Sequence, residues 1–309
     1  MSAFERARAV LDALDLGGPE PEALPDGLSS HAWRIPSVPG DLVLRLPVDV
    51  EDGVGTYPIE HVLLARLTEL GARVPAPIQG SWLIPGWSAG PFSLTSFLPG
   101  IRLRPESSDW AAAGLATFLR LLHSIPATGF GPLAQSEGRL IGRSRHAEAG
   151  LVAAFEGLPL WPFGGVQLGE HPALVDRPEL ASAIEGHAPA IRRAALDGHP
   201  VIVHSDLHEE NVLEDDGRLG FIDFGECFVG AAGWDIAAIA YFGGWPLAEG
   251  VLAAYRDELP PTGIPADPIA ALALSFGLYR WQQDRRLGVD GDEYDNAFLH
   301  ETLARLSPR

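Results

Sequence analysis

The chain has 309 residues, 46% of them hydrophobic and 20% charged, which is enough for one large or two small domains with a substantial core. Its net charge of -19 argues against a nucleic-acid partner, because binding to phosphates requires a basic surface. No run approaches the roughly 18 consecutive apolar residues of a membrane span, and the N-terminus lacks the apolar core of a signal peptide, so we expect a soluble cytoplasmic protein.

The beginning of the chain predicts one helix followed by two short strands. Residues 4–16 place apolar side chains at helical spacing, and the prolines and glycine of residues 19–27 end that pattern. Residues 31–35 (HAWRI) and 41–47 (DLVLRLP) have the composition of short strands, and the turn PSVPG joins them.

A second helix and a hairpin complete the first hundred residues. In residues 58–71 the apolar side chains fall on one helical face, and Gly71 closes the segment. Residues 81–87 and 91–98 alternate between apolar and polar residues like the arms of a hairpin. This order predicts a small, mostly antiparallel sheet with one helix.

Helical patterns dominate from Asp109 onward, interrupted only by the segment Val201–Glu226 and its two strands. The change in pattern near Leu98 predicts a domain boundary, with an N-terminal lobe at residues 1–98 and a helical C-terminal lobe at residues 99–309. The predicted fold class is therefore α+β with two lobes.

The segment Val201–Glu226 places charged groups between two apolar, β-branched runs. The runs end in Asp206 and Asp223, and Asn211 lies in the loop between them. Carboxylate and amide oxygens that converge from adjacent strand ends can bind Mg²⁺ and orient a hydroxyl, which is what phosphoryl transfer requires of a protein. The alternative is an acidic hairpin tip that faces solvent.

The spacing within this segment is specific. His204, Asp206, Leu207 and Asn211 match the pattern H-x-D-L-x-x-x-N of a kinase catalytic loop, and Asp223 opens a D-F-G turn. A D-F-G at this distance between two strand-like runs makes coincidence much less probable than either motif alone. We therefore expect a two-lobed, kinase-like fold.

A basic residue is needed to hold the nucleotide phosphates, and all 22 basic residues of this chain are arginine. Arg45, in the second predicted strand, occupies the corresponding place, and Glu60 on the following helix can hold its charge. Arginine can bind oxygens with two donors at once, although it is not equivalent to lysine. The alternative is a surface ion pair of little energetic value.

With these motifs the chain resembles the aminoglycoside phosphotransferase family of antibiotic and small-molecule kinases, which shares the protein-kinase fold. The resemblance runs through most of the chain, including GLSSHAWRI, VLRLP, IEHVLLARLTELGARVPAPI, SLTSFLPGIRL, FLRLLHSIP, HSDLHEENVL, FIDFGE and GWDIAAI. The catalytic loop and the metal turn are highly specific, and the other segments are supportive.

The resemblance implies that residues 1–98 form the nucleotide-binding lobe and that residues 99–309 form the catalytic and substrate-binding lobe. It also implies a role for each candidate residue. It implies that Asp206 is the catalytic base, and that Asn211 and Asp223 bind Mg²⁺. The nucleotide-binding residues would be Arg45 and Glu60 at the phosphates, with the backbone of Ser96 and Leu98 at adenine. His204 and Asp235 would support the catalytic loop.

The chain also departs from protein kinases. The first hairpin has one glycine where a protein kinase has three, so backbone groups and hydroxyls near Ser29 and Ser30 would cover the phosphates, or the two serines simply form a turn. His208 replaces the lysine found two positions after the base in protein kinases, and its role stays open. Too few residues separate Asp223 from Asp235 for an activation loop, which argues against protein substrates.

The predicted function is ATP- and Mg²⁺-dependent phosphorylation of a hydroxyl on a small molecule, with no obligate protein partner. The alternatives are a metabolic kinase for choline, homoserine or a sugar, and a nucleotide-binding protein without activity. Acidic residues are spread over both lobes, and for local candidates such as Glu209, Glu210 and Glu226 we favour a solvated acidic surface over a substrate site. We therefore expect an acceptor with at most modest positive charge, whose identity the sequence does not reveal.

Overall fold

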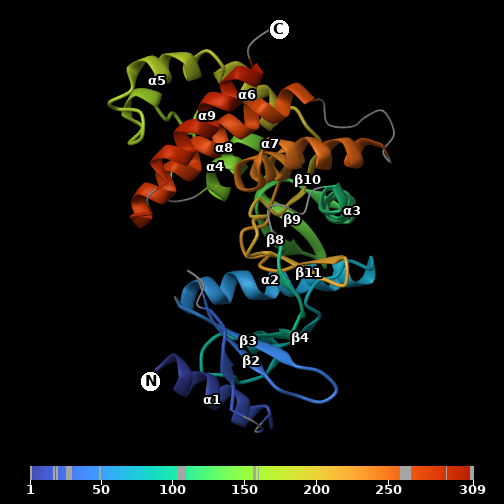
Figure 1. Ribbon diagram of the computed structural model, residues 1–309. Coiled ribbons are helices and arrows are strands. Elements are labelled where there is room, and N and C mark those ends of the chain that lie inside the picture. Colours follow the sequence, from blue (N-terminus) through green and yellow to red (C-terminus); the bar gives the residue numbers. More distant parts are fainter. Residues whose placement is uncertain are drawn as a thin grey trace. The chain divides into compact units, whose positions relative to one another are not determined.

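The computed structural model describes residues 2–16, 18, 20–25, 30–48, 50–103, 109–155, 158, 160–257, 266–289 and 291–306. The chain divides into two compact units, labelled by their elements in Figure 1. The first unit contains Met1–Ile101 and Leu213–Gly225, and the second contains Arg102–Val212 and Glu226–Arg309. The predicted lobe roles, with a boundary between residues 98 and 99, stay a prediction.

The first unit is built on a five-stranded sheet with the order β1-β2-β3-β5-β4. Strands β2, β3 and β5 pair antiparallel, and Arg45 lies opposite Ala32 on one side and Ser93 on the other. The elements of this unit are α1 (Ala3–Ala13), β1 (Glu22–Ala23), β2 (Ser30–Ile35), β3 (Leu42–Pro47), α2 (Val50–Glu69), β4 (Pro77–Gly80), the 3₁₀ helix η1 (Ser81–Leu83), β5 (Ser93–Ser96) and β12 (Arg218–Phe221). Strands β6 (Ile101–Arg102) and β11 (Val212–Asp215) contain the unit boundaries.

Two predicted elements of this unit differ from the structure. Helix α2 begins at Val50, not at residue 58 as predicted, and Pro58 lies inside it. A proline removes one backbone hydrogen bond from a helix, and this helix continues in spite of that loss. The predicted hairpin arm at residues 81–87 is wrong: Ser81–Leu83 form a 3₁₀ helix, and β5 pairs with β4 instead.

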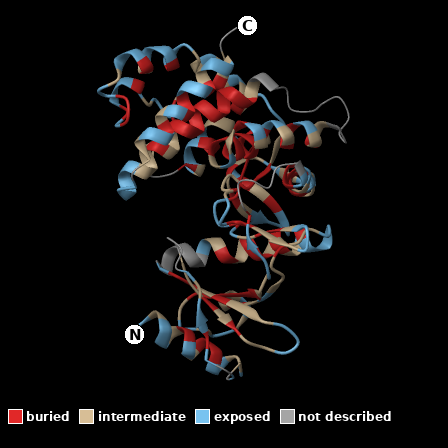
Figure 2. Cartoon of the chain, viewed as in Figure 1, coloured by how far each residue is buried: buried red, intermediate tan, exposed pale blue. Residues whose placement is uncertain are grey.

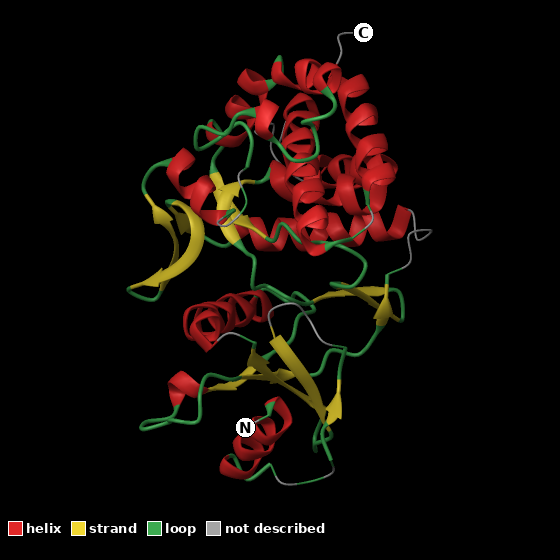
Figure 3. Cartoon of the chain, turned by 90° about the vertical axis from the view of Figure 1, so that its left-hand side faces the viewer, coloured by secondary structure: helices red, strands yellow, loops and turns green. Residues whose placement is uncertain are grey.

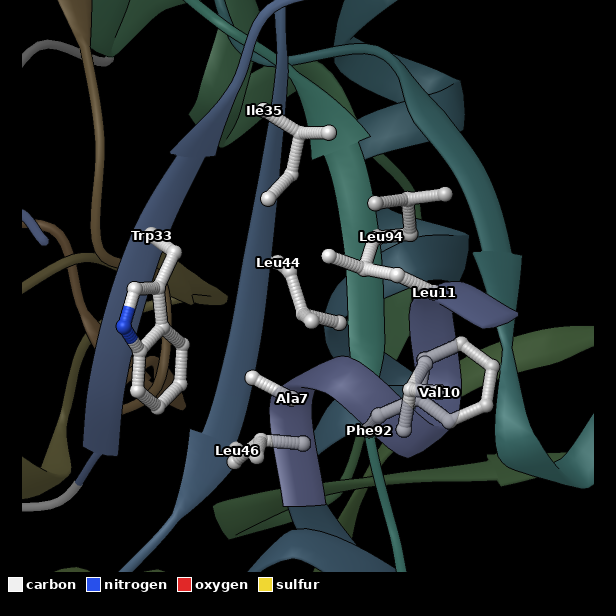
Figure 4. Packing of buried hydrophobic residues seen from close by; sticks show 9 residues of the cluster. All are labelled: Ala7, Val10, Leu11, Trp33, Ile35, Leu44, Leu46, Phe92 and Leu94. Atoms are coloured by element: carbon white, nitrogen blue, oxygen red, sulfur yellow. The ribbon is translucent and has the colours of Figure 1, made fainter. Parts of the chain in front are cut away.

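Helix α1 covers one face of this sheet. Ser2 caps the helix, because its hydroxyl accepts from the Glu5 N–H while the Glu5 carboxylate accepts from the Ser2 N–H. One face of the helix is buried against alternating residues of the strands, as Figure 4 shows. The cluster consists of Ala7, Val10, Leu11, Trp33, Ile35, Leu44, Leu46, Phe92 and Leu94.

A hairpin from much later in the chain also belongs to the first unit. Strands β11 and β12 are joined by a turn at Asp216 and Gly217, both with positive φ, as a tight hairpin requires. The Phe221 N–H donates to the carbonyl of Arg73, and the Arg73 guanidinium binds Asp215 at 2.7 Å. These contacts attach the turn that carries Asp223 to the first unit.

The second unit combines helices with a second five-stranded sheet of order β10-β13-β8-β9-β7 (Figure 3). Its strands are β7 (Ala127–Thr128), β8 (Phe130–Ser136), β9 (Arg139–Ser144), β10 (Pro200–Val203) and β13 (Phe228–Ala231). Its helices are α3 (Asp109–Ser124), α4 (Ala147–Ala154), η2 (Leu168–Glu170), α5 (Pro178–Glu185), α6 (Ala188–Leu196), α7 (Gly233–Asp257), α8 (Ala266–Leu287) and α9 (Asp292–Leu306).

Strands β7 to β9 were not predicted from the sequence. The two strands of Val201–Glu226 were expected to be neighbours, and this prediction is wrong. Strand β10 pairs with β13, whereas β12 pairs with β11 in another sheet. The cause is the Asp216–Gly217 turn, which folds the chain back on itself so that β12 finds its partner locally.

The core of the second unit lies between its long helices, where Figure 2 shows many buried residues. Trp234 on α7 and Trp281 on α8 are the largest fully buried side chains. Within the described residues, Gly233–Arg256 is long and apolar enough to cross a membrane by composition, with 56% of its most apolar window buried. The core helix of a soluble protein meets the same criterion, so this observation is weak evidence for a membrane span.

Candidate active site

The loop after β10 is held in place by one buried carboxylate. Asp235, in the first turn of α7, is fully buried, and its Oδ1 accepts from the N–H groups of His204 at 3.0 Å and Ser205 at 2.8 Å. Ser205 has a φ of 64°, a left-handed conformation that costs a residue with a side chain about 1–3 kcal/mol and is concentrated at functional sites. Asp235 thus orients the backbone immediately before Asp206.

A residue that the sequence analysis missed supports this carboxylate from the other side. His123 on α3 places Nε2 2.9 Å from Asp235 Oδ2 and Nδ1 2.8 Å from the hydroxyl of Tyr255. Because the Asp235 carboxylate can only accept, Nε2 donates, and in the neutral imidazole Nδ1 then accepts from the Tyr255 hydroxyl. The only sequence signal was a histidine at the end of an otherwise apolar helix face.

Asp206, His208 and Asn211 form a contiguous polar group on the loop. The Asn211 Nδ2 donates to the backbone carbonyl of Asp206 at 2.9 Å and to its Oδ2 at 3.1 Å, and it lies 3.0 Å from His208 Nε2. His208 Nε2 also lies 3.4 Å from Asp206 Oδ2. The structure therefore brings the predicted base and one predicted metal ligand together, with His208 beside both.

Asp206 is set up to be ionised. Burial by itself raises the pKa of its carboxyl, but the hydrogen bond to His208 and the charges of His208, His204 and Arg280 outweigh burial, and the pKa is lowered. A carboxylate that is ionised, partly exposed and held by an amide donor can accept a hydrogen bond from a hydroxyl ligand.

His204 lies inside the unit and is fully buried. Its Nδ1 accepts from the Asp206 N–H at 3.4 Å, and its ring lies edge-on to Phe118 with centroids 6.3 Å apart. This geometry favours a supporting role over proton transfer.

Arg45, Glu60 and Asp223 form a charged group within the first unit. The Arg45 guanidinium pairs with the Glu60 carboxylate, which is 3% exposed, and lies over the Tyr57 ring at 5.2 Å. Burial lowers the pKa of Arg45, but the charges of Glu60 and Asp223 raise it more, so the net shift is upward and the side chain stays cationic. Burial also raises the pKa of Tyr57 to about 12, which keeps its hydroxyl neutral.

Asp223 itself has an unusual backbone. Its φ is 61°, and the Gly225 N–H lies 3.5 Å from its Oδ1, at the limit of a hydrogen bond. Both predicted acidic centres, Asp206 and Asp223, are thus at or next to a strained left-handed residue.

The other predicted nucleotide-binding residues are Ser96, Leu98, Ser30 and Ser29. The Ser96 N–H donates to the Ala76 carbonyl at 2.9 Å, and its hydroxyl accepts from the Ala76 N–H at 2.8 Å. Leu98 packs near Gly220 in the same unit. Ser30 begins strand β2, and Ser29 lies outside the described residues.

The donor set is suitable for Mg²⁺. The amide nitrogen of Asn211 makes the contacts to Asp206 and His208, which leaves its Oδ1 for a cation, and Asp223 offers carboxylate oxygens. Among the residues that the structure describes, no group of three or more His, Cys, Asp or Glu side chains could hold a metal ion. Each of these oxygens is of a kind that Mg²⁺ binds, and the two residues belong to different units.

The comparisons with known proteins show the family and the fold. The chain belongs to the phosphotransferase enzyme family, whose model matches residues 20–265, so the predicted family and fold class are confirmed. No curated protein matches the sequence significantly.

Several solved structures share the fold at low sequence identity. Aminoglycoside phosphotransferase APH(4)-Ia is 16% identical with a TM-score of 0.66, and the match covers 99% of this chain and 100% of that chain. Aminoglycoside 2'-phosphotransferase-IIIa, solved with GDP, is 17% identical with a TM-score of 0.63 and 99% coverage of both chains. Choline kinase LicA from Streptococcus pneumoniae is 15% identical with a TM-score of 0.60, covering 98% of this chain and 99% of that chain.

Proposed function

We propose that this protein is an ATP- and Mg²⁺-dependent phosphotransferase that phosphorylates a hydroxyl group of a small molecule in the cytoplasm. The observation that carries the proposal is the loop in which Asp206 is ionised, held by the Asn211 amide and positioned through the backbone contacts to Asp235. Membership of the phosphotransferase family supports it.

In the proposed reaction, the acceptor hydroxyl donates a hydrogen bond to the carboxylate of Asp206. The hydroxyl oxygen forms a bond to the γ-phosphorus of ATP while the bond from that phosphorus to the β–γ bridging oxygen breaks, and ADP leaves. Asp206 takes the hydroxyl proton. Bound Mg²⁺ would neutralise charge on the phosphates, and Asn211 and Asp223 are the proposed ligands.

Within the first unit, Arg45 is the proposed cation for the nucleotide phosphates. Glu60 holds its side chain through an almost fully buried carboxylate, and Tyr57 packs against the guanidinium. A fixed and permanently charged guanidinium can bind two phosphate oxygens at once. Ser30 and the backbone of Ser96 and Leu98 remain the proposed additional nucleotide contacts.

A metabolic kinase is the second candidate, because choline kinase LicA shares the fold about as closely as the aminoglycoside kinases do. A protein without activity is less consistent with the chain, since the proposed base and both proposed metal ligands are present.

The proposal is tested by measuring ADP formation from Mg·ATP with a panel of aminoglycosides, amino alcohols, sugars and hydroxy acids, and the same panel with GTP as donor. We expect at least one acceptor to raise ADP formation above the acceptor-free rate, and Asp206→Asn to remove that increase. Nucleotide binding without acceptor-dependent ADP formation would instead favour a binding protein.

A further inference from the structure

Helix α8 carries an arginine, Arg280, next to the catalytic loop, and the proposed reaction gives it no ligand to bind. The Arg280 guanidinium carbon lies 4.9 Å from the ring centre of Phe242 and 6.0 Å from that of Tyr241, both on α7. On the other side, the Phe242 ring packs against His208 with centroids 5.2 Å apart. Phe242 therefore links Arg280 to the loop that contains Asp206.

Arg280 makes no hydrogen bond with any residue that the structure describes. Its nearest carboxylate, Asp284, lies 3.8 Å from Nη2, beyond hydrogen-bond distance. Its Nε is buried without a partner, although the side chain is 21% exposed. A guanidinium has five N–H donors, and proteins seldom leave a buried donor unsatisfied.

The carboxylates of α8 and α9 nearest Arg280 are already engaged. The Tyr241 hydroxyl lies 2.6 Å from Asp295 Oδ1 and 3.2 Å from Asp284 Oδ2. The indole N–H of Trp281 donates to Asp292 at 2.6 Å, and Glu210 pairs with an exposed arginine at 2.6 Å. Asp295 retains one unpartnered oxygen, but its side chain is only 1% exposed and so out of reach of a ligand. Among these groups, Arg280 is the one that solvent reaches and that has a donor without a partner.

Arg280 also lies near the proposed base. The Phe242 ring contacts both the Arg280 guanidinium and the His208 ring, and His208 Nε2 lies 3.4 Å from Asp206 Oδ2. All these residues belong to the second unit. A small molecule whose hydroxyl meets Asp206 therefore has a guanidinium in its neighbourhood.

We propose that Arg280 binds an anionic oxygen group of the phosphate acceptor, so that the acceptor is a hydroxy acid bearing a carboxylate near its hydroxyl. The proposal rests on the proposed phosphotransferase function and names its substrate class. Phe242 and Tyr241 orient the guanidinium by stacking, and Asp284 stabilises its charge while leaving the N–H donors to the ligand.

Binding of hydroxy acids is tested first without nucleotide, so that no phosphate can be transferred. Glycolate, lactate and malate are each compared with their primary amides, which keep the shape and lack the charge, by their effect on the melting temperature in the absence of nucleotide. The variants are Arg280→Gln, Arg280→Lys and, as a matched control, Arg285→Gln on the same helix, where the arginine is 44% exposed.

We expect at least one hydroxy acid to raise the melting temperature of the wild type saturably, with a weaker effect of its amide. Arg280→Gln should abolish the difference between acid and amide, Arg280→Lys should keep part of it, and Arg285→Gln should keep all of it. If no acid stabilises the wild type more than its amide does, or if Arg280→Gln keeps the preference, the inference is wrong. A loss of stability in Arg280→Gln with an unchanged ligand response would show that Arg280 is only a counter-ion for the buried carboxylates.

The ADP assay distinguishes the proposed acid-binding role of Arg280 from the proposed phosphotransferase function. In the ADP assay we expect kcat/KM to favour acids over amides by at least about tenfold, the effect of one charge-assisted hydrogen bond. Stabilisation by acids without ADP formation from any alcohol would keep the Arg280 site and refute phosphotransfer. ADP formation from neutral or cationic alcohols, without any preference for acids, would keep phosphotransfer and refute the Arg280 site. An equal loss of kcat for every acceptor in Arg280→Gln would place Arg280 at the transferring phosphate instead.

Discussion

Asp235→Asn and Asp235→Ala are expected to differ sharply, because the carboxylate of Asp235 accepts three N–H donors in a fully buried position. Alanine would leave the donors of His123, His204 and Ser205 without a partner. At about 1–3 kcal/mol for each unsatisfied buried group, the cost is about 3–9 kcal/mol, a large part of the roughly 5–15 kcal/mol that stabilises a typical folded protein.

We expect Asp235→Asn to lose much less folding stability than Asp235→Ala. The asparagine amide oxygen can still accept from His204 and Ser205, and its amide N–H can donate to His123 Nε2 if the histidine proton moves to Nδ1 and is donated to Tyr255. The donors of His204 and Ser205 and both ring nitrogens of His123 then keep a partner. The loss is smaller than in Asp235→Ala, about 1–3 kcal/mol. Because the loop carries Asp206, we also expect kcat to fall by about a hundredfold, as small displacements of reacting groups do.

The measurements are the denaturation midpoint and kcat with an active acceptor, alongside the exposed control Asp197→Asn, which should match the wild type. If Asp235→Ala is as stable as Asp235→Asn, the loss of hydrogen-bond partners does not determine the stability of this site. Wild-type kcat in Asp235→Asn would show that the loop holds its position without this carboxylate.

Four further predictions follow from the site. Asp206→Asn should keep the melting temperature and nucleotide binding but lose about a hundredfold to ten-thousandfold in kcat, the usual worth of a general base; near-normal turnover would remove Asp206 from that role. Asp223→Asn should abolish the Mg²⁺-dependent stabilisation by ATP while metal-free adenosine binding persists, as measured by calorimetry; an unchanged Mg·ATP effect would place the metal elsewhere. Arg45→Ala should raise the KM for ATP more than Arg45→Lys does, because lysine keeps the charge and loses only the paired donors, and equal damage would mean that shape matters more than charge. Burial holds the pKa of His61 and of His171 at about 4, below the usual 6.5, so the unfolded chain binds more protons between these values; stability should be complete above pH 6.5 and fall toward pH 4, and His171→Phe should reduce that slope in urea titrations.

The candidate catalytic loop could be predicted from the sequence because its groups are close along the chain. Asn211 follows Asp206 by five residues, and the structure shows the amide of one donating to the carboxylate of the other. The pairing of Arg45 with Glu60 could also be expected, since a strand followed directly by a helix brings those positions together.

The pairing of strands was harder to predict. Strands β7 to β9 carry few long apolar runs, and β10 finds its partner in β13, not in β12 as expected. Such pairing depends on which backbone edges the whole unit leaves unpaired, and a short β-branched run contains no information about its partner.

The sequence by itself determined the family, the two-lobed fold class and the chemical groups of the loop, because these depend on residue types at short, regular spacings. Only the tertiary structure decided what surrounds them. His123 and Asp235 are 112 residues apart, and Arg280 comes from a helix far beyond the loop that contains Asp206. Contacts of this kind form when helices pack against one another, and packing depends on the shape of the entire core, which no local pattern encodes.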